Sequence, residues 1–436
     1  FLNDDEIYNY SIKNAAVETR GIEGLTLSAA RIDATGDSNT NKFDLELADA
    51  VLGIDNVIQL NGSQLNFAVE GTGENKTVSF NGKGLGAFAG YGSQTAETTD
   101  DVGLAISNAD FDFFLNKDKS FNYYLNNAQV QTRGINGLNL NVDSLSAIGD
   151  KDNLNLSLIN AELGLGNSIK LSGDSVDFVI ESDGTNQNID FRGRNLSAFA
   201  GYGLATAERT DDVGLEISNA DLDIEIKADK SYSYKLENAN AKSYGITGLN
   251  LDINQLNATG DATKLLLTSA EFEVGLANVV GVSGDALSLD IEDGKPIVIS
   301  ASKAAALVGY GANTKDVADD VGLSISNADI NVTVENDSNY SYTINNASAG
   351  FVGIDGLTLQ ANQVNVTGNQ NTANVNTGDF EIGLQDVGYI KGNGLAYYPA
   401  ESSTEPLKIG AKNIEAFVGI GGGTDEESGI KLSSGT

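Results

Sequence analysis

Hydrophobic and polar residues alternate along most of the chain, and the alternation slips by one position at regular intervals. In the segment Leu215–Ile224, apolar residues occupy every second position up to Ile217 and resume at Ala220 after a slip at Ser218-Asn219. Strict alternation predicts a strand with one buried face. A one-residue slip allows the chain to bend while the same face stays inward. The pattern therefore predicts bent strand segments, which are typical of the arcs of a solenoid coil.

This bent-strand sequence pattern recurs along the chain, roughly every 18 residues. In one stretch it occurs six times, at Leu154–Leu163, Ile169–Phe178, Ile189–Phe199, Leu215–Ile224, Tyr232–Ala241 and Leu249–Leu256. Asn, Ser, Gly and Ala gather at the slip, because they are small or tolerate a left-handed backbone. We expect stacked asparagines at this point to form hydrogen-bonded ladders.

A longer period divides the chain into four copies of one unit. Gly-Tyr-Gly begins at Gly90, Gly201 and Gly309, and Gly-Ile-x-Gly-Leu-x-Leu begins at Gly21, Gly134, Gly245 and Gly353. Asp-Asp-Val-Gly-Leu begins at Asp100, Asp211 and Asp319, with a degenerate copy at Glu426. The 436 residues thus form four copies of about 109 residues, at 1–113, 114–224, 225–332 and 333–436. Both ends fall inside a copy, so we expect the chain to be cut from a longer array.

Two all-β architectures are compatible with these periods. A parallel β-solenoid, or β-helix, of about 24 coils explains both the long and the short period. Tandem immunoglobulin-like β-sandwiches also have units of about 100 residues. A sandwich does not require one sequence pattern to occur six times within each unit, whereas a solenoid does, so the sequence favours the solenoid.

Composition excludes several function classes. The net charge is -35, and the chain has no His and no Cys. The absence of these residues removes disulfides, thiol nucleophiles and the Ser-His triad. A chain this acidic repels nucleic acid and anionic membranes. The apolar runs are too short for membrane insertion as a helix.

Paired carboxylates are the sharpest candidates for chemistry. The pairs are Asp100-Asp101, Asp211-Asp212 and Asp319-Asp320. Hard cations take several carboxylate and carbonyl oxygens, so these six residues are candidate calcium ligands, and calcium is the only cofactor that the sequence suggests. The alternative is a solvated loop of an acidic protein. Gly-Asp turns at Gly36, Gly149 and Gly260 are similar candidates.

Catalysis is not expected. A glycosidase needs a specific pair of carboxylates, and with 61 acidic residues such pairs occur by accident. The acidic features also recur in every copy, whereas an active site is usually unique.

The tyrosine pairs, such as Tyr232/Tyr234 and Tyr340/Tyr342, place both rings on one strand face. They form either a stacked column or a row able to bind sugars.

The segments Ala198–Gly203, Asp212–Leu215 and Gly245–Leu249 resemble a repeat of very large bacterial secreted and surface proteins of the adhesin-like, haemolysin-type kind. The resemblance implies a location outside the cell or on its surface. The expected role is a structural segment, a stiff acidic rod in a fibre, stalk or matrix, whose partners are further copies of the same repeat. The alternatives are an adhesin module that binds polysaccharide or a host surface, and a β-helix enzyme acting on polysaccharide.

Overall fold

The computed structural model describes the chain in segments. These are residues 9–20, 25–54, 58–72, 75–91, 101–135, 138–165, 168–182, 187–202, 212–247, 249–276, 280–310, 320–335, 339–369, 373–398, 408–422 and 425–434. In these segments the structure has 27 strands and no helix. The chain divides into two compact units, Phe1–Arg209 with Asn219–Tyr232, and Thr210–Ser218 with Ser233–Thr436. We describe each unit by itself.

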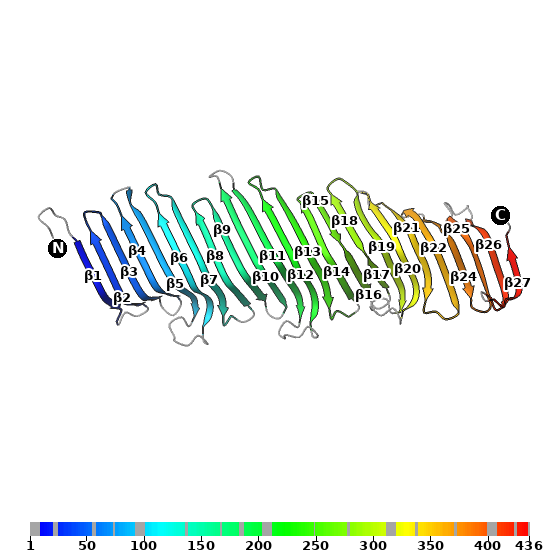
Figure 1. Cartoon of the computed structure of the whole chain (residues 1–436), viewed down its shortest axis with the longest axis horizontal. Coiled ribbons are helices and arrows are strands. Elements are labelled where there is room, and N and C mark those ends of the chain that lie inside the picture. Colours follow the sequence, from blue (N-terminus) through cyan, green and yellow to red (C-terminus); the bar gives the residue numbers. More distant parts are fainter. Residues whose placement is uncertain are drawn as a thin grey trace. The chain divides into compact units, whose positions relative to one another are not determined.

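Unit 1 is an antiparallel meander in which each strand pairs with the next (Figure 1). Its strands are β1 (Asn9–Glu18), β2 (Leu25–Asp37), β3 (Lys42–Ile54), β4 (Ile58–Glu70), β5 (Thr77–Tyr91), β6 (Val102–Leu115), β7 (Phe121–Arg133), β8 (Leu138–Asp150), β9 (Leu154–Leu165), β10 (Ile169–Ser182) and β11 (Gln187–Tyr202). The strand β12 (Val213–Ile226) is divided between the units at Asn219.

Unit 2 continues the antiparallel pattern with three interrupted strands. Its strands are β13 (Tyr232–Tyr244), β14 (Leu249–Asp261), β15 (Lys264–Ser269), β16 (Glu271–Leu276), β17 (Val280–Gly284), β18 (Ala286–Glu292), β19 (Ile297–Tyr310), β20 (Val321–Val334), β21 (Tyr340–Val352), β22 (Leu357–Asn369), β23 (Ala373–Asn376), β24 (Asp379–Leu384), β25 (Gly388–Tyr398), β26 (Lys408–Ile420) and β27 (Ser428–Ser433). The pairs β15/β16, β17/β18 and β23/β24 each take the place of one long strand, because β14, β19 and β22 pair with both members of a pair.

The expected parallel solenoid is therefore wrong, although the all-β class is confirmed. Paired strands run in opposite directions, and the members of each interrupted strand continue in the same direction. The expected sandwich does not fit either, since the described strands of each unit pair into one sheet. Two of the hairpins, β6/β7 and β12/β13, lack the usual glycine signal because their left-handed position holds a lysine, Lys119 (φ 67°) or Lys230 (φ 68°). Asp118 supports the first of these loops by accepting a hydrogen bond from the Ser120 backbone N–H at 2.9 Å.

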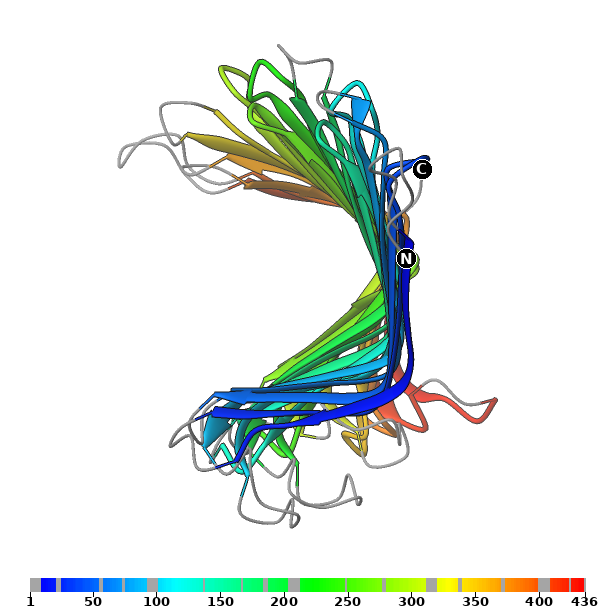
Figure 2. The same ribbon diagram turned by 90° about the vertical axis from the view of Figure 1, so that its left-hand side faces the viewer.

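The phase slip in the sequence is a real bend. In most long strands one residue near the middle has a positive φ, and the most frequent type is asparagine, as at Asn108, Asn127, Asn160, Asn195, Asn219, Asn238, Asn327 and Asn346. Asparagine tolerates this left-handed conformation better than other non-glycine residues do. Figure 2 shows the strands of unit 1, from blue to cyan, turning sharply partway along their length and enclosing a concave side. In β6, Ile106 before the bend residue Asn108 and Phe111 after it line the same groove, so the slip keeps both on one side of the sheet.

Alanines that follow the bend residue line the inside of the bend and form what we call the alanine crease. Ala128 and Ala239 are completely buried, and Ala109, Ala220, Ala304, Ala328 and Ala347 are almost so. In unit 2, Ala304, Ala328 and Ala347 make a buried cluster against Ile325 and Ile344. Small side chains fit here because larger side chains of the same and neighbouring strands, such as Ile330 and Val364, pack against the alanines. No large side chain among the described residues is fully buried, whereas several alanines of the crease are.

Candidate functional site

The Asp-Asp and Gly-Ile markers of the sequence lie next to each other in space. Asp101 precedes β6 and Gly134 follows β7. A Cβ atom placed on Gly134 would lie 2.3 Å from the Asp101 carbonyl oxygen. The same approach joins Gly245 to Asp212 and Gly353 to Asp320. Each glycine also has a φ between 55° and 65°, so only glycine fits without strain. We call each of these arrangements an Asp–Gly corner.

At the first Asp–Gly corner, the carboxylate is neutralised by arginine. Arg133 Nη1 lies 2.8 Å from Asp101 Oδ2, and the Asp101 side chain is 7% exposed. The Arg133 guanidinium also lies over the Phe88 ring, 6.0 Å from its centroid. The protein therefore already supplies the positive charge that a metal ion would bring.

The other two corners lack this arginine, because Tyr244 and Val352 occupy its position. At the second corner Asp212 is buried, and the Tyr244 hydroxyl donates to Glu216 Oε2 at 2.7 Å. At the third corner, the Asp320 Oδ1 atom is buried and has no hydrogen-bond partner among the described residues. The same sequence motif thus has three different electrostatic surroundings.

Half of the predicted calcium ligands, Asp100, Asp211 and Asp319, lie outside the described residues. Within the described segments, no three or more Asp, Glu, His or Cys side chains come together in a group able to hold a metal ion. Calcium binding therefore stays a prediction. Among its described candidates, only Asp320 has an unpartnered buried oxygen.

The Gly-Asp turns use their carboxylates to close hairpin loops. Asp150 Oδ1 accepts from the backbone N–H of Asp152 at 2.7 Å and of Asn153 at 2.8 Å. Asp261 Oδ1 likewise accepts from the Thr263 N–H at 2.7 Å. These backbone hydrogen bonds lower the pKa of Asp150 and Asp261. The carboxylates are therefore already engaged in local structure.

The glycines of the Gly-Tyr-Gly marker pair with glycines of the next strand. Gly90 stands opposite Gly103, and the same pairs form at Gly309/Gly322 and Gly419/Gly429. A Cβ on Gly90 or Gly103 would lie 2.9 Å from the Phe88 ring, so the ring covers this glycine pair. These glycines therefore allow two neighbouring strands of the sheet to approach closely. The tyrosine pair behaves as expected in one described case, since the Tyr340 and Tyr342 rings stack with centroids 6.4 Å apart.

Side-chain hydrogen bonds link neighbouring strands along the crease, but those at Asp110 and Asp329 are accepted by aspartate and do not form the expected ladder of asparagines. Asp110 accepts from the Gly84 N–H at 3.1 Å on one neighbouring strand and from Asn127 Nδ2 at 3.0 Å on the other. Asp329 accepts in the same way from the Lys303 N–H and from Asn346 Nδ2, at 3.4 and 2.8 Å. Each carboxylate thus bridges three consecutive strands. The sequence signal for the acceptor was Asn-Ala-Asp at the slip of β6 and β20, while the donating asparagine lies at the slip of the next strand.

Comparisons with known proteins give no family for this chain. No family model, no curated protein and no solved structure matches it. None of the described residues forms a helix long and apolar enough to cross a membrane.

Proposed function

We propose that the chain is a structural repeat segment of a large extracellular bacterial surface protein, in a fibre, stalk or matrix. Its repeats would act as mechanical elements, and their partners would be further copies of the same repeat. No chemistry is required of it. The acidic composition would keep neighbouring assemblies soluble and apart, and divalent cations such as calcium would screen that charge where assemblies pack side by side.

The observation that carries this proposal is the continuity of the hydrogen-bonded ladder where one copy meets the next. The boundary between copies at residues 113 and 114 falls inside β6, and β6 pairs with β7 from Gly103↔Arg133 to Leu115↔Phe121. The boundary at 332 and 333 falls inside β20, which pairs with β21 in the corresponding register, from Gly322↔Val352 to Val334↔Tyr340. A sheet without joints resists bending and extension better than beads on a linker do.

The edge strands support association with further copies. β27 begins with Ser-Gly-Ile, which corresponds to the Val-Gly-Leu at the start of β6 and β20. β1 contains a Tyr-x-Ile segment, which corresponds to segments of β7 and β21. Inside the chain these two kinds of strand pair with each other. A strand of the β27 kind and a strand of the β1 kind, from further copies of the repeat, would therefore form the same ladder.

Electron microscopy of the full chain tests this proposal. We expect smooth ribbons without joints, which lengthen as the protein concentration rises. Ile430 and Leu432 of β27 are 72% and 68% exposed, so Ile430→Asp with Leu432→Asp should shorten the ribbons by adding charge to an acidic edge. Ile159→Asp, at an exposed site of β9, is the control. A string of separate globules would contradict the proposal.

An adhesin role is the second candidate, and the exposed tyrosines favour it. Tyr10, Tyr232 and Tyr340 are each more than 40% exposed, and Tyr340 stacks on Tyr342. Exposed aromatic rings can stack on the apolar faces of sugars. A glycan array separates the two roles, since binding at micromolar concentration that is lost in Tyr340→Ala would favour adhesion.

A further inference from the structure

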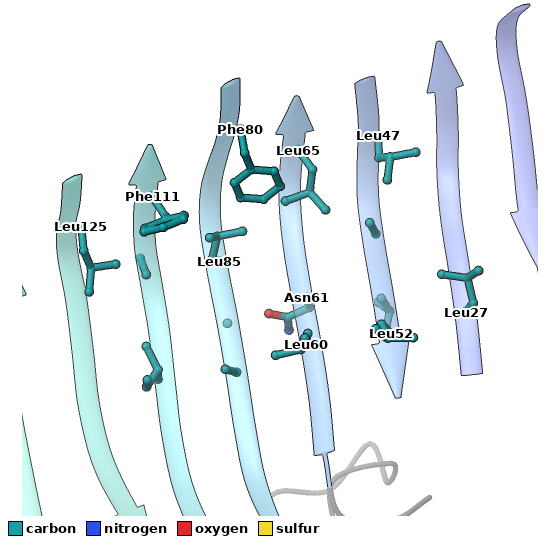
Figure 3. A pocket seen from close by; sticks show the side chains of 16 residues that line it. Leu27, Leu47, Leu52, Leu60, Asn61, Leu65, Phe80, Leu85, Phe111 and Leu125 are labelled. Carbon is teal, nitrogen blue, oxygen red and sulfur yellow. The ribbon is translucent and has the colours of Figure 1, made fainter. Parts of the chain in front are cut away.

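The concave side of unit 1 carries an apolar groove of about 430 Å³ across six consecutive strands, β2 to β7. Sixteen residues line it, and Asn61 is the only one of them with a polar side chain (Figure 3). Leucines project into the groove from several strands, and Leu27 and Leu60 are 37% and 45% exposed. A groove of this size, with no charged lining residue, falls within the range of small-molecule sites.

We propose that this groove binds the hydrocarbon chain of a single-chain lipid with an uncharged head group. This inference is independent of the structural role proposed above. It assigns to the concave face a ligand that the repeat pattern alone does not suggest.

The backbone groups of the strands that form the groove are already hydrogen-bonded, and this favours binding of a hydrocarbon chain over binding of an extended peptide. β4 pairs with β3 on one side and with β5 on the other, over nearly its whole length. β5 and β6 are likewise paired on both sides. The backbone groups of the floor are therefore satisfied, and a bound peptide would lose its own hydrogen bonds to water without gaining others. A hydrocarbon chain has no such groups to satisfy.

The length of the groove fits a long acyl chain. Crossing from β2 to β7 takes five inter-strand steps of about 4.8 Å, or roughly 24 Å in total. A saturated chain advances about 1.25 Å per bond, given single bonds of about 1.5 Å, so 16 to 18 carbons span roughly 20 Å. The ligand would lie across the strands, at the bottom of the bend.

The charge distribution selects the head group. In β3 the carboxylates Asp44 and Glu46 alternate with Leu45 and Leu47, so they lie on the opposite face from the groove. Glu46 is paired there with Arg31 at 2.6 Å. With a net charge of -35 on the chain, a fatty-acid carboxylate or an anionic phospholipid would be repelled. A monoacylglycerol has the required apolar chain and no charge.

Photocrosslinking with a diazirine-labelled 16-carbon monoacylglycerol tests the proposal on the full chain. Mass spectrometry of the digested protein should place the crosslinks on β3 to β6. Leu60→Glu should reduce them at least tenfold by placing a charge in the groove. Ile159→Glu, at a site of matched exposure (47%) outside the groove lining, should change them less than twofold. The corresponding labelled fatty acid should crosslink at least fivefold less than the monoacylglycerol.

Several outcomes would overturn the inference. Crosslinks absent from β3 to β6, or reduced equally by both variants, would show that the groove is not the site. A change of sedimentation coefficient in Leu60→Glu without any lipid crosslink would assign the face to a second copy of the chain. If Leu60→Glu fails to fold by circular dichroism, Leu60→Asn replaces it, with the same expected loss of crosslinks.

Discussion

The alanine crease and the Asp–Gly corners both recur along the chain, but they differ in how uniformly they are built. At the crease, buried alanines and bridging carboxylates reappear with the same partners, as Asp110 and Asp329 show. At the corners, the close backbone approach to glycine is constant. The aspartate forms an ion pair with an arginine in the first copy, whereas in the third copy its Oδ1 atom has no hydrogen-bond partner among the described residues. Backbone geometry is thus repeated more strictly than side-chain electrostatics.

The physical reason lies in packing. A bend residue and its alanine have neighbours on both adjacent strands, so a change in one copy disturbs the next. An aspartate at a corner lies just before its strand begins, outside the strand ladder, and its surroundings vary between copies. The predictions below use this difference.

The largest effect is expected from overfilling the crease. Ala128 is completely buried, so Ala128→Leu should destabilise the protein by about 3 kcal/mol, because the side chains around it leave no room for the added carbons. Urea unfolding measures this. Ala16→Leu, the same substitution at an exposed alanine of β1, is the control and should change stability by less than about 0.5 kcal/mol. Equal effects of the two substitutions would show that the crease is not tightly packed.

Removing the arginine of the first corner should have the next largest effect. Arg133→Leu leaves the Asp101 carboxylate buried without its counter-ion and should cost about 2 kcal/mol, discounted for the partial exposure of Arg133. The double variant Asp101→Asn with Arg133→Leu should recover at least half of that loss. If the double variant is as unstable as Arg133→Leu, the cost comes from lost packing on Phe88 and not from charge.

The bend residue should contribute less than either. Asn127 has a φ of 58° and donates to Asp110. Asn127→Ala should cost about 1–2 kcal/mol, through a strained left-handed backbone and a lost hydrogen bond. Asn127→Gly is the matched variant, since it removes the hydrogen bond but relieves the strain, and it should cost less. The reverse order in thermal unfolding would contradict the role of the left-handed backbone.

The third corner should respond in the opposite direction. Asp320 has a buried oxygen without a described hydrogen-bond partner, so Asp320→Asn should raise stability by up to about 1 kcal/mol by removing a buried charge. If calcium binds there, millimolar Ca²⁺ should raise the melting temperature of the unmodified protein more than Mg²⁺ does, and should not do so in Asp320→Asn. Equal responses to Ca²⁺ in both proteins would exclude Asp320 as a ligand.

The sequence predicted the local bends well and their connections poorly. The slip at Ser218-Asn219 correctly indicated a bend at Asn219, because alternation and left-handed propensity are properties of neighbouring residues. Whether the next strand returns parallel or antiparallel depends on the hairpin, and the lysine at Lys230 hid that signal. The ion pair at the first corner could not be predicted from the sequence either, because Arg133 and Asp101 lie 32 positions apart and come together only through strand pairing. The alternation showed that one face is apolar, but it could not show that this face stays open as a groove.

The smallest expected effect on stability concerns Glu415, a carboxylate that is paired with residues of both neighbouring strands. Glu415 on β26 accepts from the Tyr389 hydroxyl at 2.7 Å and pairs with Lys431 and Lys391, at 2.9 and 3.0 Å. Chiefly through the Tyr389 hydrogen bond, followed by the two lysines, these contacts lower the pKa of Glu415 to about 2, from 4.5.

A lowered pKa stabilises the folded state above the ordinary value of 4.5, and this contribution is lost as the pH falls from there toward 2. Glu415→Gln should therefore flatten the fall of the urea midpoint between pH 5 and pH 2.5, while Glu271→Gln, an exposed carboxylate of the same unit, should leave it unchanged. Because solvent screens this cluster, the difference should be small. An unchanged slope in Glu415→Gln would mean that cross-strand pairing at this half-buried site adds no measurable stability, in contrast to the buried pair of Asp101 with Arg133.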